Sequence, residues 1–308
     1  MPSNQTPLGA WPSRFRRQRV LIVGCGDVGM RAARALPRRV RVLALTSSPG
    51  RVAQLRAAGI TPLAGNLDQP GSLARLAGIA HRVIHLAPPA SGNAGESQRD
   101  LRTEHLLRLL RLRTPPTTFV YGSTTGVYGD CRGEWVTEAR PPSPQTARGR
   151  RRVDAERQVR FFGRGAGARA SVLRIPGIYA PDRPAGTPRE RLLRGTPVLV
   201  SEDDVYTNHI HADDLARGLL AALWRGRPQR TYNASDDSVL KMGDYFDLAA
   251  DLYGLPRPPR VTRDAAQEQL PATLLSFMAE SRRMDNTRLK RELRLRLRHP
   301  TVASGLRG

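Results

Sequence analysis

Gln18-Arg-Val-Leu-Ile-Val-Gly-Cys-Gly-Asp-Val-Gly-Met30 is the stretch that decides the fold of this chain. Its apolar run, residues 20–23, is unbroken and stops at a glycine, which predicts a short strand buried on both faces. Gly24, Gly26 and Gly29 then form a G-x-G-x-x-G motif, and residues 30–36 follow with the composition of a helix. A glycine loop between a strand and a helix is typical of a dinucleotide-binding site.

Each glycine of this loop would have its own physical task. Gly24 would make the tight turn, Gly26 would let the backbone approach a pyrophosphate, and Gly29 would let the helix pack closely on the strand. The free N–H groups at the start of the helix would face the phosphates, with Asp27 and Val28 beside them. Glycine is common in this chain, so a purely structural turn is the alternative interpretation.

The N-terminal half alternates between strand-like and helix-like segments. Strands are expected at 40–45, 61–64, 81–87 and 117–122, and helices at 49–58, 70–77 and 98–112. This alternation predicts an α/β fold with a Rossmann-type, doubly wound parallel sheet. Ligands of such sheets bind where the strands end at the carboxyl edge, which predicts further cofactor contacts at Thr46, Ser47, Asn66, Leu67, Leu86 and Ala87.

The end of the second predicted strand bears on which dinucleotide is bound. A site that prefers NAD places Asp or Glu there to bind the ribose 2′-hydroxyl, yet no acidic residue occurs between Asp27 and Asp68. Small hydroxyl groups followed by Arg51 could accept a 2′-phosphate instead, with Arg31 as a second cation. NADP(H) is therefore favoured over NAD(H), although Arg51 could equally be a solvated residue of the next helix.

The composition limits the class of protein. The formal charge of the 308 residues is +23, but only Lys241 and Lys290 are lysines and the arginines are scattered over nearly every segment. We therefore do not expect nucleic-acid binding and expect the charge to attract small anionic ligands. No apolar run approaches the roughly 18 residues of a membrane span, and the two cysteines fit no metal or redox spacing. A cytoplasmic protein without a metal site is expected.

Further along the chain, residues 122–130 read Gly-Ser-Thr-Thr-Gly-Val-Tyr-Gly-Asp. With them the chain resembles the extended short-chain dehydrogenases/reductases of the NAD-dependent epimerase/dehydratase type. In that family a Ser/Thr-rich segment running into Val-Tyr-Gly carries the catalytic Ser or Thr. The resemblance places this role on Thr124, with Ser123 beside it.

Three more segments match family patterns in the right order. Residues 174–179, which include Pro176 and Tyr179, resemble the family's Arg-x-x-x-x-Tyr-Gly-Pro segment next to the nicotinamide. Residues 208–215 resemble its Ile-His-Val-Asp-Asp-Leu signature, and residues 65–68 its adenine-side Gly-Asp-Leu-x-Asp, with Asn66 replacing the first acid. The resemblance spans about residues 18–300 and implies a Rossmann fold, a nicotinamide cofactor and hydride-transfer chemistry.

The chain departs from the family at the catalytic Tyr-x-x-x-Lys pair. Alignment of Glu156 with the family's helix acid puts Arg148 at the Tyr position and Arg152 at the Lys position. Arginine stays protonated at any working pH and cannot serve as a general acid. Arg152 could still hold a ribose or phosphate of the cofactor, and Arg148 could bind a substrate anion. The resemblance is thus to an atypical member of the family.

A proton donor would have to come from elsewhere in the chain. Tyr128, Tyr179, His85 and a bound water are candidates, although Tyr128 could be a packing residue and His85 a hydrogen-bonded core histidine. Arg183 belongs to a Pro- and Gly-rich segment, residues 176–188, which is expected to cover the substrate. Of the residues that follow His209 and His211, Asp213 or Asp214 is expected to cap the helix at 215–224.

The chain beyond residue 175 is expected to contain fewer strands than the part before it. Helices are predicted at 189–194, 241–253 and 264–280, with a strand at 229–233 and a solvated amphipathic run at 288–298. The predicted organisation is a flexible extension (1–17), a Rossmann domain (18–175) and a mostly helical substrate-binding part that returns to the sheet (176–308).

Two functions follow from these observations. The first is an NAD(P)-dependent oxidoreductase or epimerase/dehydratase-like enzyme for a small polar substrate, which the resemblance suggests is a nucleotide-linked sugar; a homodimer is possible. The second is a catalytically silent NADP(H)-binding sensor, because the Tyr-Lys pair is missing.

Overall fold

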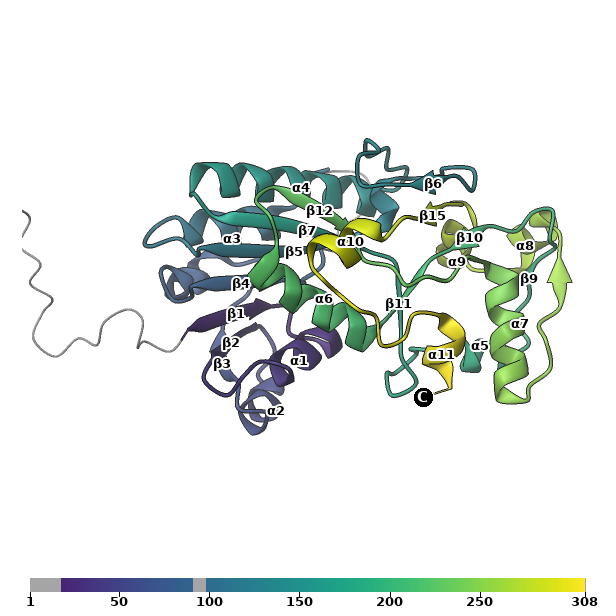
Figure 1. Cartoon of the computed structure of the whole chain (residues 1–308), viewed down its shortest axis with the longest axis horizontal. Coiled ribbons are helices and arrows are strands. Elements are labelled where there is room, and N and C mark those ends of the chain that lie inside the picture. The colour runs from purple at the N-terminus through teal and green to yellow at the C-terminus, as the bar shows by residue number, and fades with distance from the viewer. Residues whose placement is uncertain (1–17, 91–97, 308) are drawn as a thin grey trace, which may run out of the picture.

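A parallel sheet of seven strands forms the centre of the molecule (Figure 1). The structure is a computed structural model that describes residues 18–90 and 98–307, so the expected extension at 1–17 lies outside the described residues. The strand order is β12-β7-β5-β4-β1-β2-β3, and every neighbouring pair runs parallel. The predicted α/β fold with a doubly wound sheet is confirmed.

The strands of this sheet follow the apolar runs of the sequence. The apolar residues of the first strand, Val20–Val23, are fully buried, because helices cover both faces of the sheet. The edge strand β12 comes from the C-terminal part of the chain and pairs with β7, the last strand of the predicted Rossmann domain. The seven strands are β1 (Arg19–Val23), β2 (Arg41–Thr46), β3 (Thr61–Ala64), β4 (Arg82–His85), β5 (Thr118–Thr124), β7 (Arg169–Ile175) and β12 (Arg230–Asn233).

Helices cover both faces of the sheet, and one predicted helix differs in type. On one face lie α1 (Asp27–Arg34), α2 (Arg51–Ala57), α6 (Ala212–Arg225) and α10 (Thr287–Glu292). On the other lie α3 (Leu101–Leu110), α4 (Ala147–Gly165) and η2 (Pro70–Leu76). The segment η2 is a 3₁₀ helix, because its Pro-Gly start favours a tight turn over a regular α-helix.

The C-terminal part packs around its own apolar cluster, beside the sheet (Figure 1). Its helices are α5 (Arg189–Leu193), α7 (Met242–Tyr253), α8 (Arg263–Gln269), α9 (Ala272–Met278) and α11 (Val302–Leu306). The single helix expected at 264–280 is wrong: Pro271, which has no N–H to donate, separates α8 from α9. Short strand pairs join the part together: β9 (Val198–Leu199) with β14 (Arg260–Val261), and β10 (Tyr206–Thr207) with β13 (Leu240–Lys241).

Other short elements lie between the two parts. They are η3 (Thr125–Val127), β6 (Trp135–Val136) paired with β15 (Arg283–Met284), and β8 (Gly177–Tyr179) paired with β11 (His209–His211). No helix in the described part of the chain is long and apolar enough to cross a membrane.

The run at 288–298 is helical only in its first half. Helix α10 ends at Glu292, and Arg294 has a φ of +51°, which a continuing helix cannot contain. Leu289, Leu293 and Leu295 are buried in the core beside α6. In this run, the expected solvated face is therefore made by the arginines, because the leucines pack into the core.

Candidate active site

The glycine loop joins β1 to α1 with the geometry that a phosphate needs. Gly24 has a φ of +82°, and a Cβ there would lie 2.4 Å from the backbone nitrogen of Ala87. A Cβ on Gly29 would lie 3.2 Å from the carbonyl oxygen of Gly24, so α1 packs tightly on the loop. A Cβ on Gly26 would meet nothing within 4 Å. The loop thus leaves open space at the position where a pyrophosphate would approach the backbone.

Ion pairs surround Asp27, the first residue of α1. The Arg31 guanidinium binds Asp27 at 3.2 Å, Asp182 at 2.6 Å and Asp213 at 2.7 Å. Nε of Arg183 lies 3.5 Å from the same Asp27 carboxylate. A carboxylate here would repel a pyrophosphate, and these guanidinium groups offset its charge. The structure thus pairs Arg31, the second cation predicted for a 2′-phosphate, with three carboxylates, and that role stays a prediction.

The same ion pairs fix the loop after β8. Asp182 and Arg183 both belong to this loop, and Arg183 also donates from Nη1 to the Ile178 carbonyl oxygen at 2.7 Å. The structure thus places Arg183, a predicted substrate contact, against the start of α1. The loop lies beside the start of α1, and its role in covering the substrate stays a prediction.

The end of β2 lies close to the glycine loop as well. Thr46 forms a local turn there, because its Oγ1 accepts a hydrogen bond from the Ser48 N–H at 3.2 Å, and Ser47 is exposed. Arg51 begins α2 and is half-buried. Burial raises the pKa of the Cys25 thiol to about 11, and the positive charge of Arg51 acts against this shift. Arg51 is therefore close enough to the glycine loop to interact with it electrostatically.

The ends of β3 and β4 complete this edge of the sheet. The Asn66 side chain accepts a hydrogen bond from the Asp68 N–H at 3.0 Å and so shapes the turn after β3. Leu67 is buried, and its carbonyl oxygen is 2.8 Å from Nδ1 of His105. The backbone of Leu86 and Ala87 lies directly against Gly24. The structure thus brings the predicted cofactor contacts of four strands to one edge.

The predicted catalytic hydroxyl groups occupy very different environments. Thr124 ends β5, is half-exposed, and its Oγ1 accepts a hydrogen bond from the Gly126 N–H at 3.3 Å. Ser123 is buried and donates to Glu156 at 2.7 Å. Tyr128 is 1% exposed and donates to Asn233 at 2.7 Å, and burial raises its pKa. Of these three hydroxyl groups, only that of Thr124 is on a side chain with appreciable exposure.

The buried partner of Ser123 also binds two arginines. Glu156 accepts hydrogen bonds from Nε and Nη2 of Arg174 at 3.1 and 2.8 Å, and from Arg160 at 3.3 Å. The Arg174 guanidinium in turn lies 4.5 Å from the centre of the Tyr128 ring. This ionic network contacts residues 123–128, called the catalytic loop here because it carries the three predicted catalytic hydroxyl groups.

The two arginines in the Tyr and Lys positions lie on α4. Arg152 is buried, and its Nη1 donates to the Tyr121 hydroxyl at 2.9 Å and to the Gly122 carbonyl oxygen at 2.8 Å. Arg148 is exposed on the first turn. A Cβ on its neighbour Gly149 would lie 2.9 Å from the Gly126 carbonyl oxygen, so this turn packs against the catalytic loop. Arg148 is therefore at the surface of the site, and Arg152 is within it.

Pro176 and Tyr179, the two site residues predicted in the segment after β7, lie in different places. Ile175 pairs in register with Thr124, so Pro176 follows at the same edge of the sheet. Tyr179 is buried in the C-terminal cluster, where its hydroxyl donates to the Thr301 carbonyl oxygen at 3.2 Å, and burial raises its pKa. The structure thus places Pro176 at the site but buries Tyr179 away from the hydroxyl of Thr124.

The histidines take structural positions. His85 is fully buried with Nε2 3.0 Å from the Thr103 hydroxyl, and burial together with the charge of Arg152 lowers its pKa to about 3. This agrees with the interpretation as a core histidine. His211, rather than either aspartate, caps α6, because its Nδ1 accepts the Asp213 N–H at 3.2 Å. The aspartates are already within the first turn.

One group of described residues has ligand atoms close enough for a metal ion: His211, Asp213 and His299, within 4.8 Å of one another. The two imidazole rings stack with their centres 3.8 Å apart, and Asp213 is paired with Arg31. These contacts give each side chain a protein partner.

Two site residues have no counterpart among the sequence predictions. Glu280 and Arg282 come from the segment after α9, and Arg282 binds Glu280 at 2.8 Å and the Gly129 carbonyl oxygen at 2.9 Å. A Cβ on Gly126 would lie 3.8 Å from Thr124 Oγ1 and 3.9 Å from Glu280 Oε2. Both oxygens thus face the space beside Gly126. No motif surrounds Glu280, so the sequence carried no signal for it.

The chain is similar to a known family and to several solved structures. The family model described as "NAD dependent epimerase/dehydratase family" matches residues 20–235. A functionally unknown conserved protein from Silicibacter pomeroyi is 31% identical, with a TM-score of 0.76, and the match covers 94% of this chain and 97% of that one. No curated protein matches the chain significantly.

Solved epimerases share the fold at lower identity. UDP-glucose 4-epimerase from Thermotoga maritima, solved with UDP-glucose, is 20% identical, with a TM-score of 0.78 and coverage of 94% and 96%. UDP-glucuronic acid 4-epimerase from Bacillus cereus, solved as a point mutant with a fluorinated UDP-glucuronic acid analogue and NAD, is 17% identical, with a TM-score of 0.75 and coverage of 94% and 97%. With the family model covering most of its length, this chain belongs to the NAD-dependent epimerase/dehydratase family.

Proposed function

We propose that this protein is an NAD(P)-dependent oxidoreductase or epimerase that acts on a small polar substrate, with a nucleotide-linked sugar as the first class to test. The observation that carries the proposal is the position of Thr124. Its half-exposed hydroxyl follows β5, at the same edge of the sheet as the glycine loop. The solved relatives with UDP-glucose or a UDP-glucuronic acid analogue supply the substrate class.

The cofactor of the proposal is NADP(H) rather than NAD(H). The open space at Gly26 and the start of α1 suit a pyrophosphate. Arg51, Thr46 and Ser47 would hold the 2′-phosphate, because no carboxylate stands at the end of β2. The dinucleotide, when bound, would supply hydride exchange at nicotinamide C4. Arg152, already held by Tyr121 and Gly122, would keep a fixed positive charge next to the catalytic loop.

Thr124 and Glu280 would both act on the reacting oxygen of the substrate, in different roles. The Thr124 hydroxyl would donate a hydrogen bond to that oxygen and orient it. Glu280 would accept or return the proton, because its carboxylate faces the same space beside Gly126 and a carboxylate can accept a proton, which a guanidinium group cannot do. Exposed Arg148 would attract the anionic part of the substrate.

Calorimetric titration with NADPH, NADP, NADH and NAD tests the cofactor assignment without a substrate. We expect the phosphorylated pair to bind more tightly, and Arg51→Gln to reduce that preference by about ten-fold or more. Arg56→Gln removes the same charge from an exposed position on the same helix and should change nothing. Failure of all four dinucleotides to bind would refute the proposal.

Turnover of UDP-sugars with the preferred cofactor then tests the catalytic residues. Glu280→Gln and Thr124→Ala should each lower kcat by about 10²-fold or more, with cofactor affinity unchanged. Equal turnover of Glu280→Gln and the wild type would remove Glu280 from the proposed chemistry.

The second candidate function is a catalytically silent sensor of NADP(H). It is favoured by one observation: both family positions for the Tyr-Lys pair hold arginines, and buried Arg152 already donates from Nη1 to Tyr121 and Gly122. A sensor would bind the dinucleotide tightly, would show no hydride exchange with any UDP-sugar, and would keep all its measurable properties in Thr124→Ala.

A further inference from the structure

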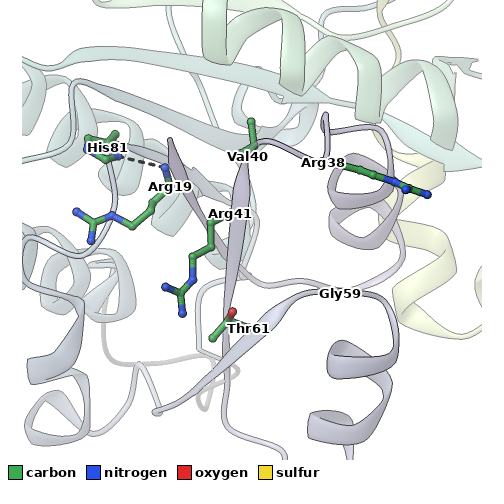
Figure 2. A pocket seen from close by; sticks show the side chains of 7 residues that line it. All are labelled: Arg19, Arg38, Val40, Arg41, Gly59, Thr61 and His81. Carbon is green, nitrogen blue, oxygen red and sulfur yellow. Dashed lines mark hydrogen bonds between the residues drawn. The ribbon is translucent and has the colours of Figure 1, made fainter. Parts of the chain in front are cut away.

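A basic cavity lies at the opposite edge of the sheet from the glycine loop. Its volume is about 510 Å³, which is within the range of small-molecule sites. It is formed at the amino ends of β1, β2 and β3 and at the turn before β4. The lining residues are Arg19, Arg38, Val40, Arg41, Gly59, Thr61 and His81, none of them a carboxylate (Figure 2).

The register of the sheet sets two of the arginines side by side. Arg19 of β1 pairs with Arg41 of β2, and neighbouring residues of parallel strands in register point to the same face. Thr61 of β3 pairs with Leu43, two residues after Arg41, and so shares that face. Figure 2 shows Arg19 and Arg41 extending to the same side, with Thr61 next to Arg41, whereas Arg38 extends away from them.

These guanidinium groups have no anionic partner in the described part of the chain. Nε of Arg19 is buried without a hydrogen-bond partner, and the side chains of Arg38 and Arg41 form no hydrogen bond or ion pair with any described residue. Like charges on adjacent strands repel each other. A buried donor without an acceptor adds a further cost. Both costs would be relieved by an anion between Arg19 and Arg41.

The imidazole of His81 adds a polar group to the same cavity. Its Nδ1 accepts the backbone N–H of Arg19 at 3.1 Å, so the ring hydrogen of the neutral form is on Nε2. The cavity thus combines two guanidinium groups, a hydroxyl and an imidazole.

We propose that this cavity binds the phosphate groups of a small phosphorylated molecule, at a site separate from the dinucleotide site. Guanidinium groups bind phosphate oxygens through two parallel hydrogen bonds, and Arg19 and Arg41 are placed to bind neighbouring oxygens. Among the described residues, the lining holds no Phe, Tyr or Trp and Val40 is its one large apolar side chain, so these residues favour phosphates over a base or an acyl chain. The ligand is an oligophosphate, either free or as the tail of a nucleotide.

Calorimetric titration at low salt, with NADPH present at saturation, tests this site. Tripolyphosphate, ATP and adenosine are the probes. We expect the first two to bind with a one-to-one stoichiometry and adenosine not to bind. Equal affinities for tripolyphosphate and ATP would assign the phosphates alone as the ligand, and tighter binding of ATP would assign a nucleotide.

Paired charge variants locate the binding. Arg19→Gln/Arg41→Gln should weaken tripolyphosphate binding by at least about ten-fold. The control Arg34→Gln/Arg56→Gln removes the same charge from two exposed positions outside the cavity and should leave the affinity within about two-fold. Without ligand, Arg19→Gln/Arg41→Gln should melt at the same temperature as the wild type or higher, because a repulsion is removed.

Three results would overturn the inference: no saturable binding, equal losses in both double variants, or complete competition by NADPH. None of them bears on the proposed function, which is tested at the other edge of the sheet. Conversely, a chain that binds no dinucleotide could still bind tripolyphosphate at Arg19 and Arg41.

Discussion

Glu156→Gln tests whether the buried ionic network that contacts the catalytic loop stabilises the fold through its charges. The side chains of Glu156 and Arg174 are 0% and 2% exposed and are joined by two hydrogen bonds. The glutamine has nearly the same shape but no charge, so Arg174 would become a buried cation without its anion. Removal of one partner from a buried ion pair costs about 3–5 kcal/mol, which is about 6–10 °C in Tm for a chain of this size.

Urea unfolding of four proteins measures this effect as a double-mutant cycle: wild type, Glu156→Gln, Arg174→Met and the double variant. We expect the double variant to be more stable than the sum of the single losses implies, by about 2 kcal/mol or more. Arg160→Gln, which removes the half-exposed third partner, is the matched control and should cost about 1 kcal/mol or less. Strict additivity in the cycle would refute the reasoning.

Further predictions concern the glycine loop, a buried acid and a thiol. Gly24→Ala should lower the Tm clearly, because its Cβ would meet Ala87 at 2.4 Å, whereas Gly26→Ala should keep the Tm and weaken dinucleotide binding in calorimetry. Burial raises the pKa of Asp236 to about 7, and its Oδ2 has no partner, so folding favours the protonated acid. The stabilising contribution of Asp236 is complete below pH 4 and is lost as the pH rises through 7. In urea unfolding, the free energy of unfolding of Asp236→Asn should therefore rise relative to that of the wild type by about 2–4 kcal/mol between pH 5 and pH 8. Identical pH profiles would contradict this. Cys25 is buried with its pKa raised to about 11, so Ellman's reagent should modify it only after unfolding.

The sequence predicted the sheet well because its strands are unbroken apolar runs between turn residues. The runs at 20–23 and 117–122 became β1 and β5 within two residues of the predicted bounds. The helices were predicted less well where proline intervened: Pro70 begins a 3₁₀ helix, and Pro271 divides a predicted helix in two. A helical period continues in the sequence even where a missing N–H ends the helix.

The site was predictable only where one local motif carries it. The glycine loop and Thr124 are read from contiguous residues, whereas Glu280 reaches the catalytic loop from more than 150 positions away and has no motif. The environment of each hydroxyl group also depends on tertiary contacts: Ser123 binds Glu156, and Tyr128 binds Asn233. Sequence patterns place a side chain on a strand or turn but do not identify its distant partner.

The strand that completes the sheet has a consequence for how this protein is made. β12 follows β7 by more than fifty residues of other structure. Arg160 and Tyr128, which precede β7 in the chain, bind Thr231 and Asn233 of β12. A ribosome that has released only the first 180 residues has therefore produced a sheet with an open edge at β7. Such an edge can pair with other chains, so we expect β7 to be open to wrong pairing until β12 covers it. For the same reason, expression of residues 18–175 alone should give aggregates rather than an isolated nucleotide-binding unit.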